Sequence, residues 1–127
     1  MLFDASASVN LCGEKKLDQI LAGCTIDLTT YEIGNAVWKQ VYIHKKITLE
    51  EANTVLDSLI DILRNLKKVE IDDFLEVLKI AVKEGINCYD ASYLYAALKN
   101  GLTLVTDDTR LRNVGDKYVE TISSIEV

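Results

Sequence analysis

Short apolar runs alternate with helix-like segments along the chain, and this alternation restricts the possible fold more than any other feature of the sequence. The clearest runs are typical of strands that are buried on both faces of a sheet. Strands that alternate with helices form a mostly parallel sheet with helices on both sides. We therefore predict an α/β protein, a three-layer α/β/α sandwich with strands within residues 1–3, 24–29, 67–72, 102–106 and 118–127.

Amphipathic segments between these runs predict the helices. The clearest spans residues 47–66, where Thr48 and Glu51 form a capping-box pattern and leucines recur at helical spacing. Residues 29–44 are predicted to form the preceding helix, with a threonine cap and Glu32 in the first turn. These two helices are expected to form a protruding hairpin. Further helices are predicted at residues 72–85, 89–101 and about 108–114.

The length of the chain fits one domain. It has 127 residues, of which 49% are hydrophobic, so we expect a single domain spanning residues 1–127. No apolar run approaches a membrane span, and the first residues lack a targeting pattern, which predicts a cytoplasmic protein. The three cysteines have no CxxC spacing and are expected to be free thiols.

Acidic residues follow the strands or begin the helices at one edge of the predicted sheet. In a parallel sheet the functional crevice lies beyond the carboxyl ends of the strands, near the point where the strand order reverses. Each acid alone can be explained as a helix cap or a partner of the helix dipole. Independent caps have no reason to gather at one edge, so we expect four acids to converge there: Asp4, Glu32, Asp90 and Asp108.

Such a cluster requires protons or cations. Two unit charges about 4 Å apart interact by roughly 4 kcal/mol at an effective dielectric near 20, so four unpaired carboxylates are strongly destabilising. Oxygen ligands suit Mg²⁺ or Mn²⁺, and two such ions can support phosphodiester cleavage. The formal charge of −6, from 14 basic and 20 acidic residues, argues against a DNA-coating protein but is compatible with a metal enzyme.

Four segments of the sequence also carry a family resemblance. In order they are "LFDAS", "YEIGNAVW", "YDASYLYAAL" and "LVTDDTRL", and together they resemble the acidic motifs of PIN-domain ribonucleases, particularly the VapC toxins of toxin–antitoxin pairs. The resemblance covers nearly the whole chain. It implies a metal-dependent endoribonuclease with Mg²⁺ or Mn²⁺ as cofactor and RNA as substrate. It also implies metal-binding or catalytic roles for Asp4, Glu32, Asp90 and Asp108.

The same resemblance separates the two members of the acidic doublet. The spacing to Leu111 favours Asp108 as the fourth acid, which leaves Asp107 as an auxiliary ligand or a cap. Ser6 and Thr106 match the small hydroxyl residues that accompany these acids and are expected to support them.

Cations and apolar side chains, as well as the acids, predict contacts with partners. Phosphate contacts with single-stranded RNA are expected from Arg110 and Arg112. Residues 29–66 carry more apolar side chains than one inward stripe can hide, which predicts an exposed groove. The resemblance implies that a small antitoxin lays a helix in this groove. We also expect the protein to form a homodimer. The apolar set named for this surface is Trp38, Tyr42, Leu59, Ile60 and Ile62.

Two other classes of protein remain open at this stage. A phosphatase or phosphoacceptor domain can also gather acids at strand ends, but it normally uses a lysine near the acids or a DxD pair after the first strand. The segment "LFDAS" has neither feature. A catalytically inactive PIN-like binding module is the other alternative, and the presence of all four acids argues against it.

Overall fold

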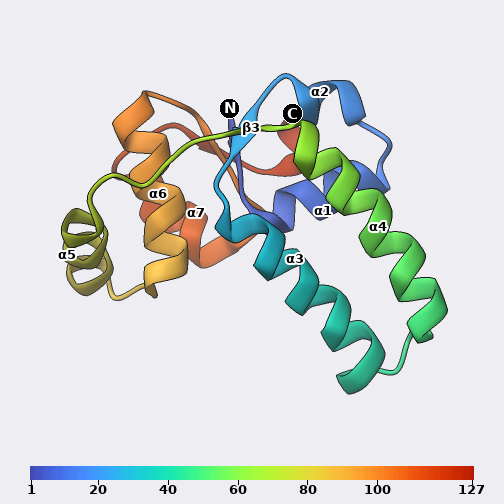
Figure 1. Cartoon of the computed structure of the whole chain (residues 1–127). Helices are drawn as coiled ribbons and strands as arrows, with labels where there is room; N and C mark the ends of the chain where they lie inside the picture. The colour runs from blue at the N-terminus through green and yellow to red at the C-terminus, as the bar shows by residue number, and fades with distance from the viewer.

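The computed structural model describes residues 1–127 and contains a parallel sheet of five strands in the order β3-β2-β1-β4-β5 (Figure 1). This confirms the predicted sheet. The strands are shorter than the apolar runs, because the chain passes into a helix or loop soon after each pairing. They are β1 (Leu2–Phe3), β2 (Cys24–Thr25), β3 (Lys67–Lys68), β4 (Leu104–Val105) and β5 (Thr121–Ile122).

Helices connect every pair of consecutive strands. No helix combines the length and the apolar composition that a membrane crossing requires. Helices α3 and α4 run as a hairpin that projects away from the sheet, as predicted (Figure 1). The elements are α1 (Ala5–Gly13), α2 (Leu17–Leu21), α3 (Leu28–Trp38), the π-helical turn η1 (Lys39–Ile43), α4 (Leu49–Asn65), α5 (Phe74–Glu84), α6 (Cys88–Asn100), α7 (Thr109–Gly115) and the 3₁₀ turn η2 (Ser124–Glu126).

Two hydrophobic cores lie on opposite faces of the sheet and produce the three layers. Consecutive strand residues point to opposite faces, so Leu2 and Phe3 belong to different cores. Leu2 and Leu104 pack with residues of α5, α6 and α7, whereas Phe3 and Val105 pack with residues of α1, α3 and α4. These two groups of helices lie on either side of the strands (Figure 1).

Helix α3 begins earlier than the sequence pattern predicts. Its N-cap is Asp27, which already has helical dihedral angles and makes no side-chain capping bond. The predicted threonine cap is therefore wrong, because Thr29 lies inside the helix and is fully buried. Glu32 consequently lies in the second turn and not in the first.

The last predicted strand is also only partly correct. Residues Thr121–Ile122 pair with β4, but the chain then turns into η2. Ser123 and Glu126 form a capping box, in which the Glu126 carboxylate accepts the Ser123 backbone N–H at 2.7 Å. This local satisfaction of backbone groups ends the strand after two residues.

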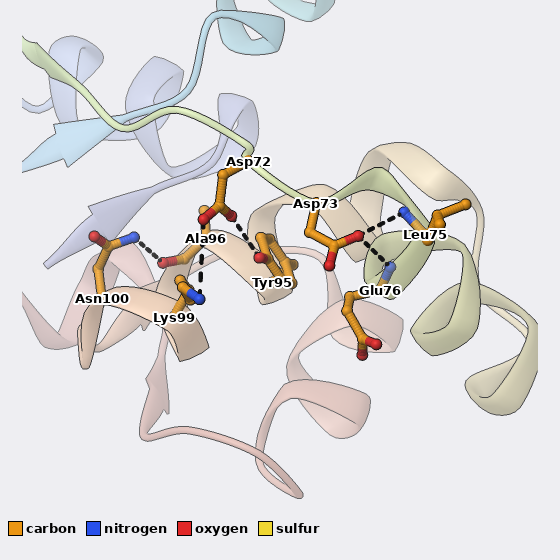
Figure 2. Close-up of polar contacts among 8 residues, drawn as sticks. All are labelled: Asp72, Asp73, Leu75, Glu76, Tyr95, Ala96, Lys99 and Asn100. Atoms are coloured by element: carbon orange, nitrogen blue, oxygen red, sulfur yellow. Dashed lines mark hydrogen bonds and ion pairs between the residues drawn. The ribbon is translucent and has the colours of Figure 1, made fainter.

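Hydrogen bonds fasten the start of α5 to α6 (Figure 2). The Tyr95 hydroxyl on α6 donates to Oδ1 of Asp72 at 2.5 Å, and Nζ of Lys99 lies 3.9 Å from Oδ2 of Asp72. The bond from Tyr95 lowers the pKa of Asp72 and raises the pKa of Tyr95 to about 12. Asp73 caps α5 by accepting the N–H groups of Leu75 and Glu76. These contacts fix the position of α6, which carries Asp90.

Candidate active site

Asp4 lies at the carboxyl end of β1, between β1 and β4, where the strand order reverses. Its Oδ1 accepts the N–H of Ala7 and the hydroxyl of Ser6, both at 2.8 Å. Its Oδ2 accepts the Thr106 hydroxyl at 2.5 Å. Asp4 is only 5% exposed, and burial raises its pKa even though the three hydrogen bonds favour the charged form.

Two hydroxyl groups join Asp4 to the backbone of the acidic doublet. Oγ of Ser6 accepts the N–H of Asp107 at 3.0 Å, and Oγ1 of Thr106 accepts the N–H of Asp108 at 3.1 Å. Each hydroxyl therefore bonds to the Asp4 carboxylate and to one residue of the loop after β4. This arrangement fixes the orientation of the Asp4 carboxylate relative to that loop.

Glu32 projects from α3 and is half-buried. Its Oε2 accepts the hydroxyl of Tyr93 at 2.8 Å. Burial raises the pKa of Glu32, and the charges of Asp90 and Asp4 raise it further, against the opposing effect of the Tyr93 bond. Glu32 thus belongs to the same electrostatic cluster as Asp4 and Asp90.

A buried series of hydroxyl groups leads from Glu32 back to β1. The Tyr93 hydroxyl lies 2.8 Å from the Thr29 hydroxyl, which lies 2.6 Å from the Thr25 hydroxyl. Thr25 donates to the Phe3 carbonyl at 2.7 Å. Burial raises the pKa of Tyr93 far above its ordinary value, so this side chain remains a protonated donor.

The sequence analysis missed the role of Tyr93. Aromatic residues on amphipathic helices usually serve the core, and the partner Glu32 is 61 residues away in the chain. The only available signal was the position of Tyr93 three residues after Asp90, which places both on one side of α6. That signal does not distinguish a core tyrosine from one that holds a carboxylate.

Asp90 lies in the first turn of α6, as predicted. The Asn87 side chain caps this helix by accepting the Asp90 N–H at 2.8 Å. Burial raises the pKa of Asp90, and repulsion from Asp108 and Asp4 raises it further, while the charge of Arg110 lowers it. The four predicted acids are therefore linked electrostatically through Asp90: Asp4, Glu32, Asp90 and Asp108.

The two members of the doublet have different environments. Asp108 is exposed and caps α7, with Oδ1 accepting the Leu111 N–H at 2.7 Å. Asp107 accepts the Asn10 side-chain amide at 2.7 Å and the Ser124 N–H at 2.8 Å. Burial acts to raise the pKa of Asp107, but the bonds from Ser124 and Asn10 outweigh it and lower that pKa. Asp107 thus connects α1 to η2, and Asp108 occupies the cap position of α7.

The two predicted RNA-binding arginines act on different acids. Arg110 is exposed, donates to the Gly85 carbonyl and acts electrostatically on Asp90. Arg112 is half-buried, and its charge acts on Asp107 and Glu126. Only Arg110 is coupled to the acids near β1. The cysteines are free thiols, as predicted.

The acids fit a divalent metal ion that is held in an open site. They supply only oxygen ligands, which Mg²⁺ and Mn²⁺ prefer. No group of three or more histidine, cysteine, aspartate or glutamate side chains is gathered closely enough to hold a metal ion by itself. Mg²⁺ is commonly held by one or two carboxylates and keeps several waters, so a hydrated ion does not require three protein ligands. The candidate ligands are Asp4, Glu32, Asp90 and Asp108.

The strand order and the acids at its reversal point define an α/β/α protein with a carboxylate-lined site. The family model of the PIN domain matches residues 1–117, and the chain belongs to this family. This confirms the family resemblance that the four acidic motifs predict.

Two relatives of similar sequence and one solved structure of similar fold come from Pyrobaculum aerophilum. Exonuclease VapC9 is 37% identical over 99 residues, which cover 76% of this chain and 71% of the relative. Ribonuclease VapC3 is 33% identical over 102 residues, which cover 77% of this chain and 75% of the relative. The crystal structure of PAE2754 has a TM-score of 0.80 at 33% identity, covering 94% of this chain and 88% of that protein.

Proposed function

We propose that this chain is a Mg²⁺- or Mn²⁺-dependent endoribonuclease and the toxin of a toxin–antitoxin pair. The observation that carries the proposal is the position of buried Asp4 at the carboxyl end of β1, where the strand order reverses, beside Glu32 and Asp90. Burial raises the pKa values of Glu32 and Asp90, and the charges of the neighbouring acids raise them further. Acids that repel one another at the reversal point of a parallel sheet are suited to bind cations there. The names of the relatives, an exonuclease and a ribonuclease, support nuclease activity.

Asp4, Glu32, Asp90 and Asp108 are the residues that would hold the metal. When bound, such an ion activates a water molecule and neutralises charge on the leaving oxygen of a phosphodiester. Ser6 and Thr106 orient the Asp4 carboxylate through both of its oxygens. Tyr93 orients Glu32, and Arg110 supplies a cation for the RNA phosphate.

Cleavage of circular and linear RNA tests the activity and the mode of attack. Purified protein is incubated with both RNAs in EDTA, Mg²⁺ or Mn²⁺, and the products are mapped by sequencing. A circular RNA has no ends, so only an endonuclease cleaves it. We expect cleavage of both RNAs with metal and none in EDTA or with Asp4→Asn. Cleavage of linear RNA alone would favour an exonuclease, and equal activity of Asp4→Asn would refute the site.

The hairpin of α3 and α4 offers a surface for the antitoxin. Trp38 is 48% exposed and Tyr42 is 69% exposed, and their rings stack with centroids 5.4 Å apart. The prediction that Leu59 belongs to this surface is wrong, because Leu59 is 7% exposed and packs in the core. Ile60 and Ile62 are half-buried against the same core. Ile60 also lines two cavities along α4, which support a groove beside the hairpin.

We expect Trp38→Ala to weaken antitoxin binding much more than RNA cleavage by the free toxin. The antitoxin is obtained by copurification with tagged protein from the native host. If the variant binds the antitoxin with unchanged affinity, Trp38 and the hairpin surface around it are not part of the interface.

An exposed apolar face on α5 supports the proposed homodimer. Leu75, Leu78 and Val82 recur at helical spacing and are 78%, 51% and 75% exposed. A second copy of the chain can cover this face. Light scattering of the wild type and of Leu78→Glu tests the dimer, which the charged variant is expected to dissociate.

A further inference from the structure

One face of α3 lines a cavity beside the proposed active site, and of the four acids only Glu32 contributes to it. Leu28, Glu32 and Asn35 recur at intervals of three or four residues, so they share this face. Lys39, the C-cap of α3, follows Asn35 at the same spacing. With Tyr31 and Ala36 from the same helix and Tyr89 from α6, these four residues enclose about 420 Å³. This volume falls within the range of small-molecule sites, roughly 300–1,000 Å³. Glu32 forms part of its wall, so the cavity adjoins the acids directly.

The two tyrosines of this cavity differ from the other tyrosines of the chain. The hydroxyls of Tyr93, Tyr95 and Tyr118 all donate to carboxylates, and Tyr42 stacks on Trp38. The two remaining rings are 77% and 60% exposed, and their hydroxyls make no hydrogen bond within the chain. They are Tyr31 and Tyr89.

Two polar side chains of the cavity, those of Asn35 and Lys39, also lack hydrogen-bond and ion-pair partners within the chain. The Lys39 ammonium forms no ion pair, and the Asn35 side-chain amide bonds to no other group of the chain. Both side chains are exposed. An amide can donate to and accept from the edge of a base, and a lysine can contact a phosphate. Aromatic rings, an amide and a cation together form the set that binds unpaired nucleotides.

We propose that this cavity binds the unstacked nucleobase of a single-stranded RNA nucleotide next to the phosphodiester at the acids. The inference rests on the proposed ribonuclease function. Tyr31 and Tyr89 supply stacking surfaces for the base, Asn35 bonds to its edge, and Lys39 contacts the following phosphate.

Comparison of an RNA strand with an abasic strand isolates the contribution of the base. The probes are a labelled single-stranded RNA of about ten nucleotides and an abasic strand of equal length and charge. Binding is measured with Mg²⁺ on a background of Asp4→Asn, which blocks cleavage. We expect this protein to bind the RNA at least about fivefold more tightly than the abasic strand. Adding Tyr31→Leu or Asn35→Ala should reduce that preference, with little change in affinity for the abasic strand.

Different results would overturn the base site and the ribonuclease function. Equal affinity for both strands, or a preference that survives both substitutions, would overturn the base site even if the unsubstituted protein cleaves RNA. Loss of affinity for both strands in both variants would also overturn it, because it would indicate a contact with the backbone alone. A base preference that both substitutions remove supports the site, and absence of metal-dependent cleavage by the unsubstituted protein would then refute the ribonuclease function alone.

Discussion

The Thr106 hydroxyl donates to Oδ2 of Asp4 across 102 residues of sequence, and this bond joins the ends of β1 and β4. The same hydroxyl accepts the N–H of Asp108. One fully buried side chain thus connects a candidate metal ligand to the backbone of another. The two side chains meet because both strands end at the same edge of the sheet, at the point where their order reverses.

Thr106→Val should lower both stability and activity. Valine keeps the shape of threonine but leaves a buried carboxylate oxygen and the Asp108 N–H without this partner. We expect the free energy of unfolding to fall by about 1–3 kcal/mol and RNA cleavage to fall at least about tenfold. Thr106→Ser keeps the hydroxyl and should retain most of the activity. Denaturant unfolding and initial cleavage rates measure the two effects, and equal behaviour of the two variants would exclude a role for the hydroxyl.

Asp90→Asn should abolish RNA cleavage and stabilise the metal-free fold. Its carboxylate is half-buried and repelled by Asp108 and Asp4, and no hydrogen bond from the protein compensates the charge. Asp4→Asn should bring a smaller gain or none, because Asp4 accepts three hydrogen bonds that asparagine can only partly reproduce. Melting temperatures in EDTA compare the two variants with the wild type.

The gain in melting temperature that Asp90→Asn brings over the wild type should increase with pH. A carboxyl group whose pKa is raised by folding binds more protons in the folded state, so its contribution to stability falls as pH rises from its ordinary pKa, near 4, through the raised value. The difference in melting temperature between variant and wild type is thus smallest near pH 4 and largest at neutral pH. Millimolar Mg²⁺ should reduce the difference at neutral pH by stabilising the wild type. A difference independent of pH would refute the raised pKa of Asp90, to which burial and the charges of Asp108 and Asp4 contribute.

Much of the fold and the general location of the site follow from local patterns in the sequence. The capping box of Thr48 and the cap at Asp73 mark helix starts by side-chain chemistry alone. Asp4 and Asp90 were placed because strand ends and helix starts of a parallel sheet meet at one edge. Glu32 was placed one turn too early, because Asp27 enters the helix without a capping bond that sequence can reveal.

The contacts between distant segments could not be predicted. The bonds of Asp107 to Asn10 and to the backbone of Ser124 depend on how α1 and η2 pack beside β4. The bond from Tyr93 to Glu32 depends on the approach of α6 to α3. Such contacts follow from the packed fold and leave no regular spacing in the sequence.

The acidic doublet should divide into a structural and a functional member. Asp107→Asn disturbs the bonds to Asn10 and Ser124, so we expect lower stability but retained cleavage below the melting temperature. Asp108→Asn keeps a capping oxygen for the Leu111 N–H and should retain stability while losing cleavage. Rates at matched Mn²⁺ concentrations, with thermal melts of both variants, make the comparison. The reverse ranking of the two rates would refute the assignment of Asp108 as the fourth acid.

Tyr93→Phe should impair catalysis through Glu32 and not through the fold alone. The change removes the hydroxyl that donates to Oε2 of Glu32 and contacts Thr29, so Glu32 is less well oriented. Tyr95→Phe is the matched control, because it removes a hydroxyl from the same helix that donates to another carboxylate, that of Asp72 (Figure 2).

We expect Tyr93→Phe to lower kcat at least about tenfold and to raise the Mn²⁺ concentration needed for half-maximal cleavage, since a misplaced ligand binds metal less well. Tyr95→Phe should lower the melting temperature but leave the Mn²⁺ dependence unchanged, because Asp72 lies beside α5 and not among the acids at β1. Metal titrations of cleavage for both variants, at a temperature where both are folded, provide the measurement. If both variants lose the same fraction of activity with unchanged Mn²⁺ dependence, Tyr93 serves only to stabilise the packing of α6.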